Sequence, residues 1–155
     1  MQDQPTTLQP HVAAATATIA KMEQQLRETQ ADLQKLPFFA RAFVERDISS
    51  STGRSFADWL PAAARLRGAL EPLAGDPAPT QADAARRAIQ DELPRLAKMR
   101  AYMTRVPEKI NMVPGGMLKP QQRQGFLAHV EQQVLAVQTL EGELAAIAAL
   151  LSGAR

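Results

Sequence analysis

The residue types that most often carry acid–base chemistry or bind metal ions are scarce in this chain. His11 and His129 are its two histidines, and the sequence contains no cysteine. His11 stands at the start of a predicted helix and His129 beside an apolar stripe, so we expect structural or solvent-exposed roles for both. Neither a His-Glu-x-x-His motif nor a carboxylate cluster accompanies them, and no thiolate can serve as ligand or nucleophile. The sequence therefore predicts no metal site and no cofactor.

Other candidate chemistries fail on spacing. The small residues Ser49–Gly53 lack the pattern of a P-loop, and no strand is predicted before them. The adjacent carboxylates of Asp91 and Glu92 point about 100° apart on a helix and so do not converge. No local base accompanies a serine, as nucleophilic catalysis would require. We therefore expect a protein that is not an enzyme and has no small-molecule substrate.

Aromatic residues are concentrated in the segment from Phe38 to Trp59. One interpretation is a local core, where short helices turn back against longer ones. The other is a partly exposed hydrophobic groove for a partner segment, since Phe38 and Phe39 cannot both point inward on one narrow helix face. Interleaved arginines would let such a groove accept an acidic peptide or a C-terminal carboxylate. The predicted partner-binding residues are Phe38, Phe39, Arg41, Phe43, Arg46, Arg54 and Trp59.

Basic residues are concentrated in the middle of the chain. The net charge of +2 does not by itself indicate nucleic acid, but nine basic side chains face three acidic ones between Arg86 and Arg123. This segment is either a solvated helix surface or, if several side chains share a face, a salt-dependent phosphate-binding site where Tyr102 stacks on a base. The candidate nucleic-acid-binding residues are Arg86, Arg87, Arg95, Lys98, Arg100, Tyr102, Arg105 and Lys109.

Two long heptad-like stripes mark the elements that must position these candidates. The first follows Pro10, which suits a first helical turn, and ends at Pro37. Its a and d positions are Val12, Ala15, Ile19, Met22, Leu26, Thr29, Leu33 and Leu36. The second begins near Pro120, with a and d positions at Phe126, Val130, Gln133, Val137, Leu140, Leu144, Ile147 and Leu151. Because the stripes share a period and need burial, we expect residues 11–37 and 119–151 to pair as an antiparallel hairpin.

Shorter helices are predicted between the two stripes. The first contains Phe39 and Phe43, the second ends at the Gly75–Pro79 breaker, and the next begins at Thr80. Pro94 lies inside this last segment and predicts either a kink or two separate helices. No segment has the alternating pattern of a strand.

These patterns together predict an all-α fold. It is a helical bundle built on a long antiparallel coiled-coil-like hairpin of the N- and C-terminal helices, with shorter middle helices. We expect a flexible N-terminal tail (1–10), a single helical domain (11–151) and a flexible C-terminal tail (152–155). The longest charge-free apolar stretch, Leu144–Leu151, is far shorter than the roughly 20 residues that cross a bilayer. We therefore expect no membrane span and a bacterial, cytoplasmic location.

The order of elements resembles that of PriC-type replication-restart proteins. The resemblance lies in a Leu/Gln-rich first helix, the Phe-Ala-Arg-Ala-Phe break from Phe39 to Phe43, Leu-rich middle helices and a last helix ending in Glu-Leu. It implies binding to single-stranded DNA and to its binding protein. Stalk and chaperone proteins of bacterial secretion systems share the same long-hairpin composition, so we assign no family and transfer no functional residue.

The leading hypothesis from the sequence is a non-enzymatic interaction module. Such an adaptor, scaffold or accessory subunit would bind a partner protein through the aromatic and arginine-containing middle segment. The alternative is a replication-associated accessory protein that binds single-stranded or non-specific DNA through the basic middle helix. Self-association as a dimer through the two heptad stripes is a third possibility.

Overall fold

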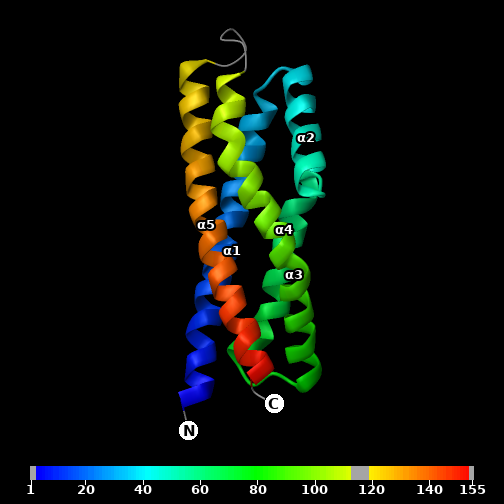
Figure 1. Cartoon of the computed structure of the whole chain (residues 1–155), viewed down its shortest axis with the longest axis vertical. Coiled ribbons are helices and arrows are strands. Elements are labelled where there is room, and N and C mark those ends of the chain that lie inside the picture. The colour runs from blue at the N-terminus through cyan, green and yellow to red at the C-terminus, as the bar shows by residue number, and fades with distance from the viewer. Residues whose placement is uncertain (1–2, 113–118, 154–155) are drawn as a thin grey trace.

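The computed structural model describes residues 3–112 and 119–153, and the side chains from Leu8 onward within them. These residues are helical almost throughout and include no strand, which confirms the all-α prediction (Figure 1). The elements in order are α1 (Asp3–Gln34), α2 (Phe38–Thr52), α3 (Phe56–Leu70), the short 3-10 helix η1 (Glu71–Ala74), α4 (Pro79–Asn111) and α5 (Pro120–Gly153).

The two terminal helices pack antiparallel, as the heptad stripes predict. Both described chain ends lie at the same end of the bundle in Figure 1. His11 Nδ1 lies 2.6 Å from Glu143 Oε2 at that end, and His129 Nδ1 lies 2.9 Å from Asp32 Oδ2 toward the other. Both histidines thus link α1 to α5, a structural role. Most residues of the stripes are buried within one chain, so a dimer formed through those buried residues would require the hairpin to open.

Helix α4 packs on α5 on one side and on α3 on the other, and α3 and α5 both pack on α1, so these four helices enclose the core. Helix α4 has 33 residues against 32 for α1 and 34 for α5, so the expectation of short middle helices holds only for α2 and α3. The helix is continuous through Pro94, and the two-helix alternative is therefore wrong. Ile89, Leu96 and Met103 keep one face of α4 buried on both sides of Pro94, and this packing outweighs one lost backbone hydrogen bond.

The ends of the hairpin also differ from the prediction. Helix α1 begins at Asp3 and contains Pro10, so residues 3–10 are helical rather than a flexible tail. Pro10 is exposed, so the backbone hydrogen bond that it removes lies on the solvent side of the helix. Helix α5 continues to Gly153, while residues 1–2 and 154–155 of the two expected tails lie outside the described residues.

Helices α2 and α3 follow one another along the same side of the bundle, each against part of α4 (Figure 1). They are joined by Gly53, whose φ of 76° is the left-handed conformation that favours glycine, and whose N–H donates to the Ser49 carbonyl. Helix α3 also packs on α1, whereas α2 packs mainly on α4. The half of the bundle that contains α2 is therefore more open than the half that contains α3.

Helix α5 is the one described helix that is long and apolar enough to cross a membrane by length and composition alone. In this fold its apolar face packs on α1 and α4 through residues such as Val137, Leu140 and Leu144. A core helix of a helical bundle can have the same length and composition.

Candidate protein-interaction site

The ends of helix α2 are fixed by its local sequence. Pro37 precedes the helix with φ −55° and ψ 149°, and its carbonyl accepts the Arg41 N–H at 3.0 Å. Gly53 ends the helix in the left-handed conformation. A proline before the first turn and a glycine after the last define a helix of 15 residues.

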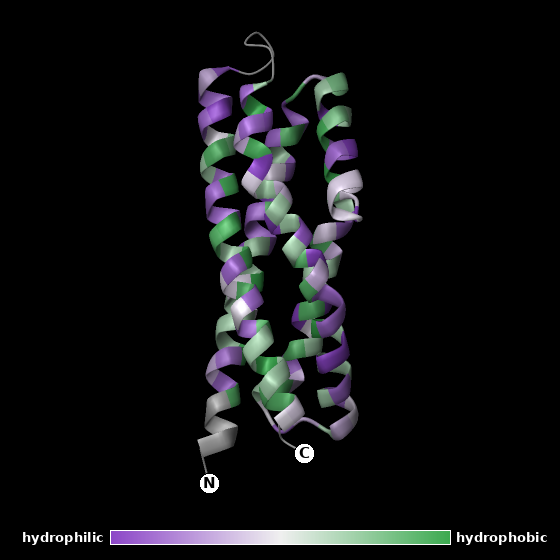
Figure 2. Cartoon of the chain, viewed as in Figure 1, coloured by the Kyte–Doolittle hydropathy of each residue, from purple (hydrophilic) through white to green (hydrophobic). Residues whose placement is uncertain are grey.

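The outer face of α2 carries the largest apolar side chains of the segment. Phe38, Phe39 and Phe43 are 76%, 59% and 68% exposed. Phe39, Phe43 and the exposed Arg46 follow at i, i+4 and i+7, which places them within about 60° of one another around the helix. We call Phe38, Phe39, Phe43 and Arg46 the phenylalanine ridge. Figure 2 shows hydrophobic residues on α2, which lies at the outer edge of the bundle.

The ridge differs from the surface that the sequence suggested. Phenylalanine side chains this exposed project from the helix, so the surface is a ridge rather than the expected groove. The adjacent Phe38 and Phe39 do not divide between core and surface, because both lie on the outside. The local-core interpretation fits the buried Trp59 and the half-buried Phe56, both on α3.

The two arginines of α2 have different surroundings. Arg41 is half-buried, with its guanidinium carbon 5.7 Å from the centre of the Phe38 ring and its Nε 3.9 Å from Glu45 Oε1. Arg46 is exposed, and no ion pair to it is found among the residues that the structure describes. Arg46 therefore leaves a positive charge on the ridge itself.

The inner face of α2 is held to α4 by a polar cluster. Lys109 Nζ donates to Asp47 Oδ2 at 2.6 Å, and the Tyr102 hydroxyl donates to the same oxygen at 3.2 Å. Burial, followed by the charge of Asp47 and this hydrogen bond, raises the pKa of Tyr102 above its ordinary value. The other inward side chains of the helix are small or branched: Ala40, Val44, Ile48 and Thr52.

Arg54 and Trp59, which the sequence grouped with the phenylalanines, belong to the interior. Trp59 is 3% exposed, and its indole N–H donates to Thr52 Oγ1 at 3.3 Å. Arg54 lies over the Trp59 ring, 4.6 Å from its centre, and makes two hydrogen bonds to Glu92 at 2.7 and 3.1 Å. A largely buried, paired arginine stacked on a core tryptophan is not free to contact a partner.

The basic residues of α4 divide into paired and exposed groups. Arg100 donates to Glu141 at 2.6 Å, Arg86 lies 3.3 Å from Asp83, and Lys109 is bound to Asp47. Tyr102 is buried, so stacking on a base would require α2 to move. The remaining candidates are exposed: Arg87, Arg95, Lys98 and Arg105.

Three of these exposed cations share one face of α4. At 100° per residue, Arg87, Lys98 and Arg105 lie within about 20° of one another, separated along the axis by about 16 and about 10 Å. The exposed Asp91 lies on the same face and reduces the local positive potential. The result is a sparse basic stripe.

Asp47 and Glu92 are central to this region, and sequence reasoning did not select them. A helical-wheel view of α2 contains a usable signal, because Asp47 lies on the same face as the apolar Ala40 and Val44, with the spacing i, i+4 and i+7. The partners of both carboxylates are far away in sequence: Lys109 is 62 residues from Asp47, and Arg54 is 38 residues from Glu92. Such pairs become visible only in the folded chain.

Comparison of the chain with protein-family models, with curated proteins and with solved structures found no match.

Proposed function

We propose that this chain is a non-enzymatic helical interaction module that binds a partner protein through the phenylalanine ridge of α2. The observation that supports this function is the exposure of Phe38, Phe39 and Phe43 on one short, capped helix. Isolated exposed apolar residues are normal, but large exposed apolar side chains one helical turn apart, such as Phe39 and Phe43, often mark a contact surface. Covering each ring fully would contribute about 1.5–3 kcal/mol.

The spacing of the ridge favours one mode of binding. Residues at i, i+4 and i+7 are the anchors by which an amphipathic helix enters a hydrophobic groove of another protein. Phe39, Phe43 and Arg46 have this spacing, and the outer face of α2 is not covered by another described helix. In this proposal α2 is the inserted element, and the partner supplies an apolar groove with an acidic side chain near Arg46.

A comparative pull-down from the native cells, read by mass spectrometry, tests this function. The variants are Phe38→Ser/Phe39→Ser and, as a matched control, Leu135→Ser on α5, where another large apolar side chain is 60% exposed. We expect the ridge variant to lose one or more proteins that the wild type and the control both retain. Thermal unfolding of all three proteins checks that each is folded.

Direct binding to the purified candidate then decides the question. Buried aromatic anchors are typical hot spots, so we expect Phe39→Ser to weaken binding at least tenfold, with little change for Leu135→Ser. Equal affinities for the two variants, or the same captured proteins for all three chains, would contradict the proposed use of the ridge.

A second candidate function is weak, non-specific binding of single-stranded nucleic acid, and the basic stripe of α4 favours it. Three exposed cations in line can each contact a phosphate. An electrophoretic titration with short single strands at two salt concentrations tests this proposal. We expect binding at low salt that weakens steeply at high salt and is lost in Lys98→Ala/Arg105→Ala. Absence of binding at low salt would exclude nucleic-acid binding as a function of this stripe.

A further inference from the structure

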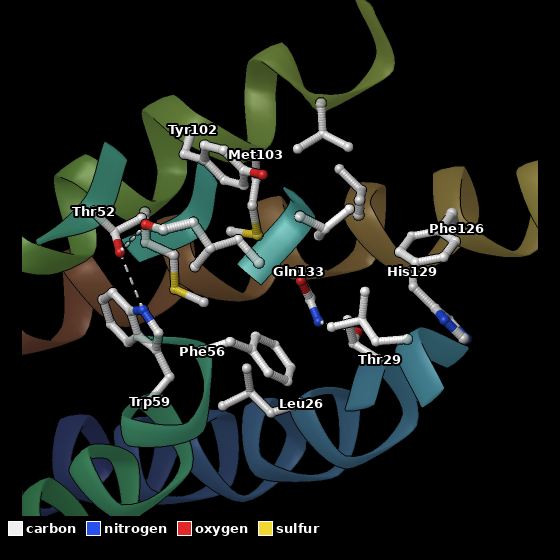
Figure 3. Close-up of a pocket in the computed structure, with 16 residues that line it drawn as sticks. Leu26, Thr29, Thr52, Phe56, Trp59, Tyr102, Met103, Phe126, His129 and Gln133 are labelled. Atoms are coloured by element: carbon white, nitrogen blue, oxygen red, sulfur yellow. Dashed lines mark hydrogen bonds between the residues drawn. The ribbon is translucent and has the colours of Figure 1, made fainter. Parts of the chain in front are cut away.

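A partly open cavity of about 70 Å³ lies beneath α2, and all five α-helices contribute to its walls. Figure 3 shows the side chains around it, with Trp59 and Thr52 toward one end and Phe126 and His129 toward the other. The lining is predominantly apolar and includes Val44, Ile48, Met99, Met103 and Val130. A cavity of this size exceeds the space that one water molecule occupies.

The orientation of α2 explains the cavity. The helix directs Val44, Ile48 and Thr52 toward the bundle, while its three phenylalanines point outward. The buried apolar residues accordingly form two clusters, a large one and a small one around Leu33 and Leu36. The cavity has wall residues from both clusters, including Leu26 and Leu33. The void is the space that large inward side chains on α2 would fill.

Most polar groups of the wall are already paired. The indole N–H of Trp59 is bonded to Thr52, and the hydroxyl of Tyr102 to Asp47. Gln133 uses its amide nitrogen on Thr29 Oγ1 at 2.9 Å, and no bond to its oxygen is found among the described residues. In Figure 3 the Gln133 side chain projects between α1 and α4 with its nitrogen toward Thr29. Its carbonyl oxygen is thus an acceptor that the wall offers to a bound donor.

A ligand with one aromatic ring requires this cavity to widen. An apolar cavity of about 150 Å³ is known to bind benzene, and this volume is roughly twice that of the cavity beneath α2. Met99 and Met103 are unbranched and adapt their shape readily, and methionine sulfur contacts aromatic rings favourably. Helix α2 itself packs mainly on α4, so a small outward shift of this helix enlarges the space.

We propose that this cavity is a binding site for a small, mainly apolar molecule of about the size of one aromatic ring, carrying a single hydrogen-bond donor for Gln133. The molecule would lie between α2 and Val130, in contact with Met99 and Met103. This site is separate from the ridge, which lies on the opposite face of α2, so either proposal can fail while the other stands.

Phenol is a suitable probe, and the readout is the NMR signal of methyl-labelled methionines in the full-length chain. We expect saturable shifts of the Met99 and Met103 methyl groups, while Met22, which does not line the cavity, stays unchanged. Thermal unfolding should show a rise in Tm that grows with phenol concentration, because a ligand that binds only the native state stabilises it.

Filling the cavity provides the decisive comparison. We expect Val44→Leu/Val130→Leu to bind phenol at least tenfold more weakly than the wild type, and Val134→Leu, outside the cavity, to bind it equally. If the double variant does not fold, the single variant Val44→Leu is compared with the wild type instead. Absence of saturable binding to the wild type, or equal binding to the filled and wild-type chains, would overturn the proposal.

Discussion

Helices α2 and α3 have the same length, 15 residues, and lie on the same side of the bundle, yet they use their large side chains in opposite ways. Helix α3 buries Trp59, Leu66 and Leu70. Helix α2 exposes its phenylalanines, and Thr52 is its only fully buried residue. The orientation of α3 is therefore set by its apolar stripe. The orientation of α2 is set by its polar residues, above all by Asp47, which binds Lys109 and Tyr102.

Electrostatics accounts for the orientation of α2. Rotating the helix to bury the phenylalanines would also bury Arg46, which lies on the same face without an ion pair among the described residues. Burial of an unpaired charge is strongly unfavourable. The same rotation would separate Asp47 from Lys109 and Tyr102. The observed orientation keeps Arg46 in solvent and leaves the aromatic rings exposed.

The largest expected loss of stability comes from a substitution in α3. Trp59→Ala removes a core side chain with a hydrogen bond to Thr52, so we expect the free energy of unfolding to fall by about 3–5 kcal/mol. Phe43→Ala on α2 should change it by no more than about 0.5 kcal/mol. Urea denaturation of both variants measures the difference, and similar losses would show that the two helices contribute alike.

The junction between the two helices gives the next effect. Arg54→Met leaves Glu92 largely buried without its partner, and we expect a loss of about 3 kcal/mol. Replacing both charges, in Arg54→Met/Glu92→Met, should restore most of that stability. If the double variant were as unstable as the single one, the loss would come from the contact of Arg54 with Trp59 instead.

The inner face of α2 gives a smaller, pH-dependent effect. Because the pKa of Tyr102 is raised in the folded state, the native chain keeps the phenol proton above about pH 10, where the unfolded chain releases it. The native state then binds more protons, so its stability is fully present at lower pH and falls above about pH 10, by at most about 1.4 kcal/mol per pH unit.

Urea denaturation of the wild type and of Tyr102→Phe at increasing alkaline pH measures this contribution. Subtraction of the two profiles isolates the contribution of the Tyr102 hydroxyl. We expect the wild type to lose stability more steeply with pH than the variant. Parallel profiles would mean that Tyr102 and Asp47 do not anchor α2 to α4 as described.

Much of the fold and the residues of the phenylalanine ridge could be predicted from local patterns, but the orientation of α2 could not. The heptad stripes of α1 and α5 predict the antiparallel hairpin, because each apolar stripe must be buried against another apolar surface of the same period. The continuity of α4 through Pro94 depends on packing against other helices. The orientation of α2 depends on Asp47 meeting Lys109, a contact between distant positions. The interior location of Arg54 likewise depends on Glu92.

The most direct test of the account is the stability of a variant that loses the ridge phenylalanines together, Phe38→Ser/Phe39→Ser/Phe43→Ser. Urea denaturation should give a free energy of unfolding within about 1 kcal/mol of the wild type, because these rings lie in solvent and support no packing. A loss of several kcal/mol, comparable to that of Trp59→Ala, would show that the phenylalanines belong to the core and would contradict the ridge as an interaction surface.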